Sequence, residues 1–358
     1  MTSTRPKRAT PNRVTPNRGS AITGWASCLP ETIVTNADLS RYLDTTESWI
    51  VDRTGIRERR VIYGPFAPRP ADPTLWTSPR GGVGTTASMA AEAGRKALEA
   101  AHLGPDDIDL LILCTTTPDQ AVPACSSVVQ SALGIHCAAF DLNAACAGFV
   151  YGLVTAASFI LGGAHRVLVI GSETLSRIVD WTDRETAVLF GDGAGAVVVE
   201  EVPGDSSLLG WDVGVDGALQ PILYADLGGN LHMVGKEVFR RAVRATVESS
   251  LAAMERAKVT AEDIALFVPH QANSRIIEAA CNRLEIPMER AAIMLDRTGN
   301  TSSASIPLAL AEALDAGRVK DGDLILMSGF GAGMTWASAV WRWSSDPLQD
   351  RDEPIVGG

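Results

Sequence analysis

The chain has 358 residues and a formal net charge of −11 at pH 7, with 46% hydrophobic and 20% charged residues. This length and composition are typical of a globular protein with one large domain or two ordinary ones. No apolar run reaches the ~18 residues that a membrane span needs. The acidic charge also argues against a general nucleic-acid binder. We therefore expect neither a membrane nor a nucleic acid among its partners.

The two ends of the chain differ in composition from its middle. Residues 1–19 hold five basic residues and no acid, and they lack the apolar stretch of a secretory signal; we expect a disordered basic leader. Residues 344–358 are polar and unpatterned, which predicts a flexible tail. The six cysteines form no CxxC pair and no zinc-type spacing with the five histidines. This pattern predicts a reduced, cytoplasmic protein without a structural metal.

The first half of the chain carries a regular series of buried runs and helices. A polar turn leads into the apolar run DDIDLLILC (106–114), followed by a helix around SSVVQSALGI, the short run AAFDLNAAC and an uncharged helix over residues 147–161. VLVIGS (167–172) and AVLFGDGAGAVVVE come next. Such continuous Val, Ile and Leu runs indicate strands buried on both faces, which requires helices on both sides of the sheet.

The second half repeats this order of elements. AEDIALFVPHQAN (261–273) is followed by SRIIEAACNRLEIP, AAIMLDRTGN, TSSASIPLALAEALDAG, LILMSG and GFGAGMTWASAVW. The offset between matching positions is nearly constant, at 156 from Ile108 to Ile264, 154 from Cys146 to Asn300 and 157 from Val167 to Leu324. A shared order over this length predicts two similar α/β halves, which we place at residues 20–202 and 203–343.

A cysteine stands at the start of the uncharged helix, in the stretch DLNAACAGFVYGL (141–153). Unpaired backbone N–H groups and the helix dipole favour a thiolate at such a position. The small residues around Cys146 leave room for a substrate carbonyl, and its own N–H could stabilise an oxyanion. From this stretch alone, an inert core cysteine explains Cys146 equally well, because free cysteine is among the most buried residue types.

Two polar residues of the second half are candidates to act with Cys146. His270 stands at the end of a buried strand, where α/β proteins place ligands; a structural histidine is the alternative. Asn300 begins the helix that corresponds to the helix of Cys146, so the duplication predicts that Cys146 and Asn300 approach one another across a pseudo-twofold axis. A helix N-cap explains Asn300 equally well.

A local basic stripe interrupts the acidic second half. Lys236, Arg240 and Arg244 are spaced four residues apart and so share one face of a predicted helix. Arg275 and Arg283 follow soon after it. The stripe suggests an acidic partner. A solvated helix face balanced by Glu237 and Glu248 is the alternative.

Seven ordered motifs resemble those of β-ketoacyl-acyl carrier protein synthase III, a branch of the thiolase-fold condensing enzymes, over residues 20–343. They are WIVDRTGIRERR, DLNAACAGF, FGDGAGA, GKEVFRRAV, VPHQANSRII, GNTSSASIPLAL and GFGAGMTW. The resemblance implies an α/β, thiolase-like fold whose duplicated halves form a five-layered αβαβα arrangement. It also implies a Cys-His-Asn triad of Cys146, His270 and Asn300, with an oxyanion hole made by the backbone N–H groups of Cys146 and Ala332.

The resemblance implies a decarboxylative Claisen condensation. Cys146 takes the acyl group of an acyl-CoA, and malonyl-acyl carrier protein then loses CO₂ at His270 and Asn300 to give a 3-ketoacyl-acyl carrier protein. This reaction primes fatty-acid or polyketide synthesis without a metal or redox cofactor. One alternative is an acyltransferase of the same family that moves the acyl group to a specialised-metabolite acceptor without condensation. A catalytically inactive partner subunit is disfavoured by the complete triad.

The resemblance also implies residues for substrate and partner binding. Trp49 and Arg184 flank the CoA adenine, Arg53 contacts the nucleotide end, and Asn273 contacts the pantetheine arm. An acidic carrier protein docks on Arg240, Arg244, Arg275 and Arg283. Family members are usually homodimers in which one subunit closes the acyl pocket of the other, and this implies Val122. Residues 61–82 are longer than is usual in the family, and their prolines predict an ordered flap.

Overall fold

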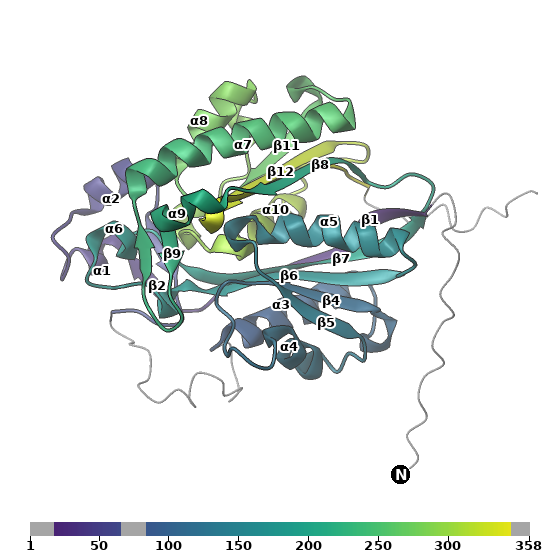
Figure 1. Cartoon of the computed structure of the whole chain (residues 1–358), viewed down its shortest axis with the longest axis horizontal. Coiled ribbons are helices and arrows are strands. Elements are labelled where there is room, and N and C mark those ends of the chain that lie inside the picture. Colours follow the sequence, from purple (N-terminus) through teal and green to yellow (C-terminus); the bar gives the residue numbers. More distant parts are fainter. Residues whose placement is uncertain (1–17, 66–83, 345–358) are drawn as a thin grey trace, which may run out of the picture.

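The structure, a computed structural model, describes residues 18–65 and 84–344 of the chain (Figure 1). Two mixed sheets dominate this part, with the strand orders β1-β7-β6-β4-β5 and β11-β12-β13-β8. Their strands are β1 Arg18–Cys28, β4 Leu110–Cys114, β5 Ala138–Leu142, β6 Arg166–Thr174, β7 Asp192–Pro203, β8 Leu208–Val215, β11 Ile264–Pro269, β12 Leu324–Gly331 and β13 Thr335–Arg342.

The two sheets follow the same plan. In the first, β4 runs parallel to β5 and β6, and β7 runs antiparallel to β6 and β1. In the second, β11 runs parallel to β12, and β13 runs antiparallel to β12 and β8. A single parallel bridge between Phe267 and Ala291 stands where the first sheet has β5. The predicted duplication is therefore confirmed at the level of sheet topology.

Helices separate and cover the two sheets. Figure 1 shows α5 (Gly148–Leu161) and α10 (Ser305–Asp315) in the layer between them, where both helices contact strands of both sheets. The outer face of the first sheet is covered by α3 (Thr86–Ala100) and α4 (Cys125–Leu133), and that of the second by α7 (Gly235–Ala257) and α8 (Ser274–Leu284). This confirms the predicted five-layered αβαβα arrangement.

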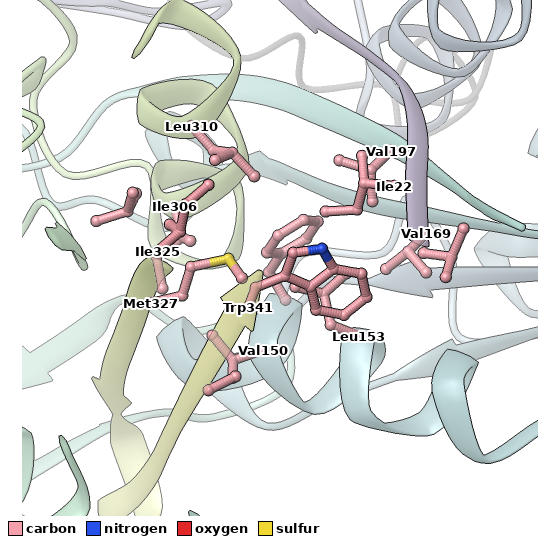
Figure 2. Packing of buried hydrophobic residues seen from close by; sticks show 14 of the residues in the cluster. Ile22, Val150, Leu153, Val169, Val197, Ile306, Leu310, Ile325, Met327 and Trp341 are labelled. Atoms are coloured by element: carbon pink, nitrogen blue, oxygen red, sulfur yellow. The ribbon is translucent and has the colours of Figure 1, made fainter. Parts of the chain in front are cut away.

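The central layer is also the largest apolar core. In Figure 2, buried side chains from both sheets and both central helices meet around Trp341: Ile22, Val150, Leu153, Val169, Val197, Ile306, Leu310, Ile325 and Met327. Each such side chain stabilises the fold by about 1.5–3 kcal/mol when it is fully buried. Because the core joins the halves, it fixes the distance between the carboxyl ends of their parallel strands.

The turns before the two central helices correct the predicted register of the repeat. A 3₁₀ turn, Ala145–Ala147, precedes α5, and a second one, Ser302–Ala304, precedes α10 at an offset of 157. Ala145 and Ser302 each have a φ of +49°. Asn143 and Asn300 each accept a hydrogen bond from the backbone N–H two residues on. The offset of 154 is therefore wrong at this point: Asn300 corresponds to Asn143, and Cys146 corresponds to Ser303.

Smaller elements lie around the ends of the central strands. They are β2 Ile33–Thr35, α1 Asn36–Leu39, α2 Glu47–Thr54, β3 Glu58–Arg60, α6 Arg184–Ala187, β9 Leu223–Ala225, β10 Leu231–Met233 and α9 Leu295–Thr298. The predicted boundary between the halves falls where β7 ends, five residues before β8 begins. None of the helices within the described ranges combines the length and apolarity needed to cross a membrane.

The predicted leader, residues 1–19, is wrong at its last two positions. Arg18 and Gly19 belong to β1, where Arg18 pairs with Pro203. The buried Arg18 guanidinium forms an ion pair with Glu201 of β7. The counter-charge of Arg18 comes from a distant strand. The sequence near Arg18 therefore gives no sign that this arginine is paired and buried. Residues 1–17, residues 66–83, which include most of the expected flap, and residues 345–358 of the expected tail lie outside the described part of the chain.

Candidate active site

A cavity of about 520 Å³ opens at the carboxyl ends of the central strands. Cys146, His270 and Asn300 all line it. The fold brings them together because the turn before α5, the end of β11 and the turn before α10 all reach this edge of the two sheets. The rest of the wall is largely apolar and includes Leu189, Leu223, Met233, Val238, Ile276 and Phe330.

Cys146 lies in the 3₁₀ turn and precedes the first residue of α5 by two positions. Burial raises the pKa of its thiol to about 12, although the neighbouring Ser302 hydroxyl acts to lower it. At neutral pH the resting sulfur is therefore a neutral thiol, which differs from the thiolate that its place near a helix start predicts. Desolvation is the largest cause of this shift, because burial disfavours the charged form of a thiol.

The end of β12 approaches the backbone of Cys146 closely at the cavity wall. A Cβ atom at Gly331 would stand 2.5 Å from the Cys146 backbone nitrogen, so only glycine leaves space there. Ala332 follows directly, and Gly333 after it has a φ of +128°, which favours glycine. Cys146 and Ala332, the residues predicted to form the oxyanion hole, both line the cavity.

His270 is held from three sides and is 2% exposed. Its Nδ1 lies 2.6 Å from the Ser305 Oγ, and its ring packs edge-on against Phe330 at 5.2 Å between centroids. Its backbone N–H donates to the Ser328 carbonyl at 2.8 Å. Burial lowers the pKa of His270 to about 3. The imidazole is therefore neutral at neutral pH and presents one donor and one acceptor nitrogen.

The Asn300 side chain is oriented by its own turn. Its Oδ1 accepts from the Ser302 backbone N–H at 2.9 Å, and its backbone N–H donates to the Leu189 carbonyl at 2.8 Å. Because Oδ1 is engaged, the Nδ2 hydrogens are the donors that Asn300, as a residue of the cavity wall, has to offer a ligand. The N-cap alternative is wrong for α10, whose N-cap is Ala304.

Glu173 is a buried neighbour of the triad that the sequence reasoning missed. Its carboxylate accepts hydrogen bonds from the hydroxyls of Thr117 at 2.6 Å, Ser303 at 2.8 Å and Ser302 at 3.0 Å. The Thr116 backbone N–H donates to it as well, at 3.1 Å. Ser302 lies two residues after Asn300, so Glu173 supports the turn that carries Asn300. The available signal was an acid directly after the buried run VLVIGS.

The residues expected at the nucleotide end of CoA gather around Trp49. The guanidinium carbon of Arg53 lies 4.8 Å from the centroid of the Trp49 ring, and that of Arg184 lies 4.9 Å from it. Arg184 also donates to the Asp44 carbonyl at 2.7 Å. The pair predicted to flank an adenine is thus stacked directly, and a base entering between them must displace Arg184 from Trp49.

Asn273 lines the cavity but already has structural partners. Its Oδ1 accepts from the Arg275 backbone N–H at 2.9 Å and so caps α8. Its Nδ2 donates to the Arg53 carbonyl at 2.9 Å, which ties α8 to α2. One Nδ2 hydrogen and one Oδ1 lone pair remain for the pantetheine contact predicted from the sequence.

The four arginines expected to receive a carrier protein are exposed on α7 and α8. Arg240 pairs with Glu237 and Arg244 with Glu248, each at 2.7 Å, as the balanced-face alternative predicts. Arg275 and Arg283 project from the neighbouring helix α8.

Val122 does not line the cavity of its own chain, and its side chain is 85% exposed. Across residues 18–65 and 84–344, no group of three or more His, Cys, Asp or Glu side chains is arranged to hold a metal ion.

Comparison with known proteins identifies one family repeatedly. The family model described as 3-Oxoacyl-[acyl-carrier-protein (ACP)] synthase III matches residues 140–217, and the model of its C-terminal part matches residues 254–343. Beta-ketoacyl-[acyl-carrier-protein] synthase III 1 of Bacillus anthracis is 47% identical over 324 residues, covering 90% of this chain and 98% of that protein. The synthase III of Roseiflexus sp. (strain RS-1) is 46% identical over 343 residues, covering 91% and 99%.

Solved structures agree in fold. The 3-oxoacyl-[acyl-carrier-protein] synthase III of Aquifex aeolicus VF5 superposes with a TM-score of 0.82 at 42% identity, covering 91% of this chain and all of that one. The priming β-ketosynthase of the R1128 polyketide biosynthetic pathway superposes with a TM-score of 0.81 at 36% identity, covering 94% of this chain and 98% of that one.

Proposed function

The chain belongs to the 3-oxoacyl-[acyl-carrier-protein] synthase III family, and we propose from its cavity how individual residues carry out the family reaction. The resemblance predicted from the motifs is confirmed. The enzyme condenses an acyl-CoA with malonyl-acyl carrier protein and thereby primes fatty-acid or polyketide synthesis. One observation supports the proposed roles above the others: a single cavity holds a cysteine together with a neutral histidine and an oriented asparagine.

In the first half-reaction, the Cys146 sulfur attacks the thioester carbon of acyl-CoA. The bond from that carbon to the CoA sulfur breaks, and the proton of the Cys146 thiol passes to the CoA sulfur. The backbone N–H groups of Cys146 and Ala332 hold the oxyanion of the tetrahedral intermediate. One such donor is typically worth ~10²–10³ in rate. The attacking form of the sulfur is the thiolate, so the thiol proton leaves Cys146 as the new carbon–sulfur bond forms.

In the second half-reaction, His270 and Asn300 donate hydrogen bonds to the thioester carbonyl of the malonyl group. The bond to the carboxylate breaks and releases CO₂, and its electron pair forms an enolate that these two donors stabilise. The α-carbon then attacks the acyl carbon on Cys146. The carbon–sulfur bond breaks, and the sulfur takes up a proton from solvent. These steps balance without a metal or redox cofactor. Because they transfer an acyl group from CoA to the malonyl carbon, acyltransferase is the class of enzyme that we propose.

The surroundings of the cavity suggest how substrates approach. We assign the nucleotide of CoA to Trp49, Arg53 and Arg184, and the pantetheine arm to Asn273. The acidic carrier protein docks against Arg240, Arg244, Arg275 and Arg283, where it competes with Glu237 and Glu248 for two of them. The proposed assembly is a cytoplasmic homodimer in which Val122 of one subunit borders the acyl site of the other.

Intact-protein mass spectrometry tests the proposal. Incubation with a panel of acyl-CoAs adds one acyl mass to the wild-type chain, and the Cys146→Ala variant gains none. Adding malonyl-acyl carrier protein then clears the adduct with release of CO₂. The matched control is Cys281→Ala, which removes a buried thiol from α8 and keeps the adduct.

The outcomes separate the candidate functions. An adduct that is cleared without CO₂ release by an alcohol or amine acceptor points to the acyltransferase alternative that transfers without condensing. No adduct with any acyl-CoA contradicts both functions.

A further inference from the structure

A serine hydroxyl lies directly behind the catalytic histidine, on the side away from the cavity. Ser305 is the first residue of α10, it is 1% exposed, and it does not line the cavity. Its Oγ is 2.6 Å from the Nδ1 of His270 and also accepts the Gln271 backbone N–H at 3.3 Å. Ser305 therefore touches the histidine without being able to touch a substrate.

The direction of the Ser305–His270 hydrogen bond follows from counting hydrogens. The Ser305 Oγ has one hydrogen to donate, and within the described part of the chain His270 Nδ1 is the only acceptor it reaches. If Nδ1–H donated instead, Oγ would receive two hydrogens and its own would be left buried without an acceptor. A buried donor without a partner is costly, so Ser305 donates and Nδ1 accepts.

The tautomer of His270 then follows. Burial lowers the pKa of His270 to about 3, so the ring is neutral and carries one hydrogen. Because Nδ1 accepts from Ser305, that hydrogen must be on Nε2, the nitrogen on the opposite side of the ring.

We propose that Ser305 is a positioning residue that holds His270 as the Nε2–H tautomer, so that the ring donates to the malonyl thioester carbonyl and does not act as a base toward Cys146. This inference rests on the proposed function for its kinetic consequence, but the tautomer itself is a property of the free enzyme. In other protein sites, too, a group that hydrogen-bonds to one ring nitrogen of a histidine fixes its tautomer.

The duplicated half shows that the hydroxyl is not required by the fold. At the offset of 157, Ser305 of α10 corresponds to Gly148, the first residue of α5. His270, the residue after β11, corresponds to Thr115, the residue after β4, at an offset of 155 that the pairing of these strands with β12 and β6 sets. The hydroxyl at the helix start is therefore present in the half that has a histidine to hold and absent from the half that does not.

The tautomer can be read without any substrate. In enzyme labelled with ¹⁵N-histidine, two-bond ¹H–¹⁵N correlation spectra distinguish a protonated ring nitrogen from an unprotonated one, and His270→Gln identifies the signals of His270. We expect a protonated Nε2 and an unprotonated Nδ1 in the wild-type enzyme, and a mixture of both tautomers in Ser305→Ala. A wild-type ring protonated on Nδ1 overturns the proposal.

The two half-reactions provide the functional test. In Ser305→Ala, acylation of Cys146 by acyl-CoA stays within about 2-fold of wild type, because it does not use His270 as a base. Decarboxylation of malonyl-acyl carrier protein by the acylated enzyme falls by about 10- to 100-fold, since one enolate donor becomes misdirected; removing such a donor outright costs ~10²–10³. Ser305→Thr keeps a hydroxyl and restores most of the decarboxylation rate.

Ser338→Ala is the matched control, because it removes a buried hydroxyl from β13 that bonds the Ser328 hydroxyl at 2.8 Å. It leaves both half-reactions unchanged. Equal loss of both half-reactions in Ser305→Ala, or no loss in either, contradicts the proposal. A wild-type enzyme that is never acylated contradicts the proposed function instead, and the tautomer measurement then still decides the role of Ser305.

Discussion

At the scale of single residues, the candidate site is built from uncharged side chains. Hydrogen bonds to their neighbours decide which donor and acceptor atoms remain available to a substrate. Desolvation keeps the Cys146 thiol protonated, and it keeps the His270 ring uncharged. The Asn300 amide presents its nitrogen because its oxygen is bonded to Ser302. A reaction that passes through two oxyanions gains most from such fixed donors in a site with little water.

The space beside the Cys146 N–H gives a prediction for Gly331→Ala. The new Cβ would stand 2.5 Å from the Cys146 nitrogen and 2.7 Å from the Ala145 Cβ, so it displaces the turn or covers the oxyanion donor. We expect acylation by acyl-CoA to slow by about 10²–10³, the typical worth of one oxyanion donor. Rapid-quench mass spectrometry of the acyl adduct measures the rate.

Gly217→Ala is the control for Gly331→Ala, because a Cβ at Gly217 has no neighbour within 4 Å. Acylation at the wild-type rate in Gly331→Ala, with the fold intact by circular dichroism, would show that the Cys146 N–H is not an oxyanion donor.

At the scale of elements, Glu173 joins the two halves of the duplication. It extends from β6 of the first half, accepts from the loop after β4, and accepts from the turn before α10 in the second half. Its carboxylate is fully buried, so these hydrogen bonds, and not water, compensate for its desolvation.

Glu173→Gln keeps the volume of the side chain but turns one acceptor oxygen into an NH₂ group facing hydroxyl and N–H donors. We expect the free energy of unfolding to fall by about 1–3 kcal/mol, the cost of leaving a buried polar group unsatisfied. Urea denaturation followed by tryptophan fluorescence measures it. Glu237→Gln breaks only a surface pair and changes stability by less than about 0.5 kcal/mol. A Glu173→Gln midpoint equal to that of wild type would contradict this role.

The sequence predicts the elements and the triad better than it predicts side-chain partners. Buried runs repeated in one order are a local signal, so the duplication and the meeting of Cys146 with Asn300 were accessible. The register of the turns before α5 and α10 was not, because the offset between matching positions varies from 154 to 157 along the chain. The bond from Asn273 to the Arg53 carbonyl and the stacking of Arg184 on Trp49 depend on segments far apart in the chain. Ser305 was hidden among three serines in GNTSSASIP, where only the fold shows which one meets His270.

At the scale of the whole molecule, β5 leaves one edge of the first sheet open in the described chain. Phe140 of β5 contacts Phe159 of α5 at 6.3 Å between ring centroids, and Phe159 is 46% exposed. Asp141 of β5 accepts from the first two backbone N–H groups of α4, three and four residues after Val122. Phe140 and Phe159 lie at this sheet edge, and Val122 shortly precedes the helix that Asp141 caps; we call these three residues the edge surface. Exposed sheet edges invite pairing with another chain.

The proposed homodimer uses the edge surface, and Phe159→Glu tests it. In a twofold dimer each substitution occurs twice in the interface. Losing the burial of two phenylalanines costs about 3–6 kcal/mol, which weakens association by about 10²–10⁴. We expect light scattering to show two-chain particles for the wild type and one-chain particles for Phe159→Glu. Condensing activity should fall in parallel, because Val122 no longer borders the neighbouring acyl site.

Leu227→Glu is the matched control for Phe159→Glu, since it places the same charge at an exposed leucine between β9 and β10. It should keep the two-chain mass. A fully active one-chain Phe159→Glu would separate assembly from catalysis and remove Val122 from the acyl site. If the Phe159→Glu variant still has the mass of two chains, the dimer interface lies on another face of the molecule. The open edge of β5 is then not covered by a second copy of the chain.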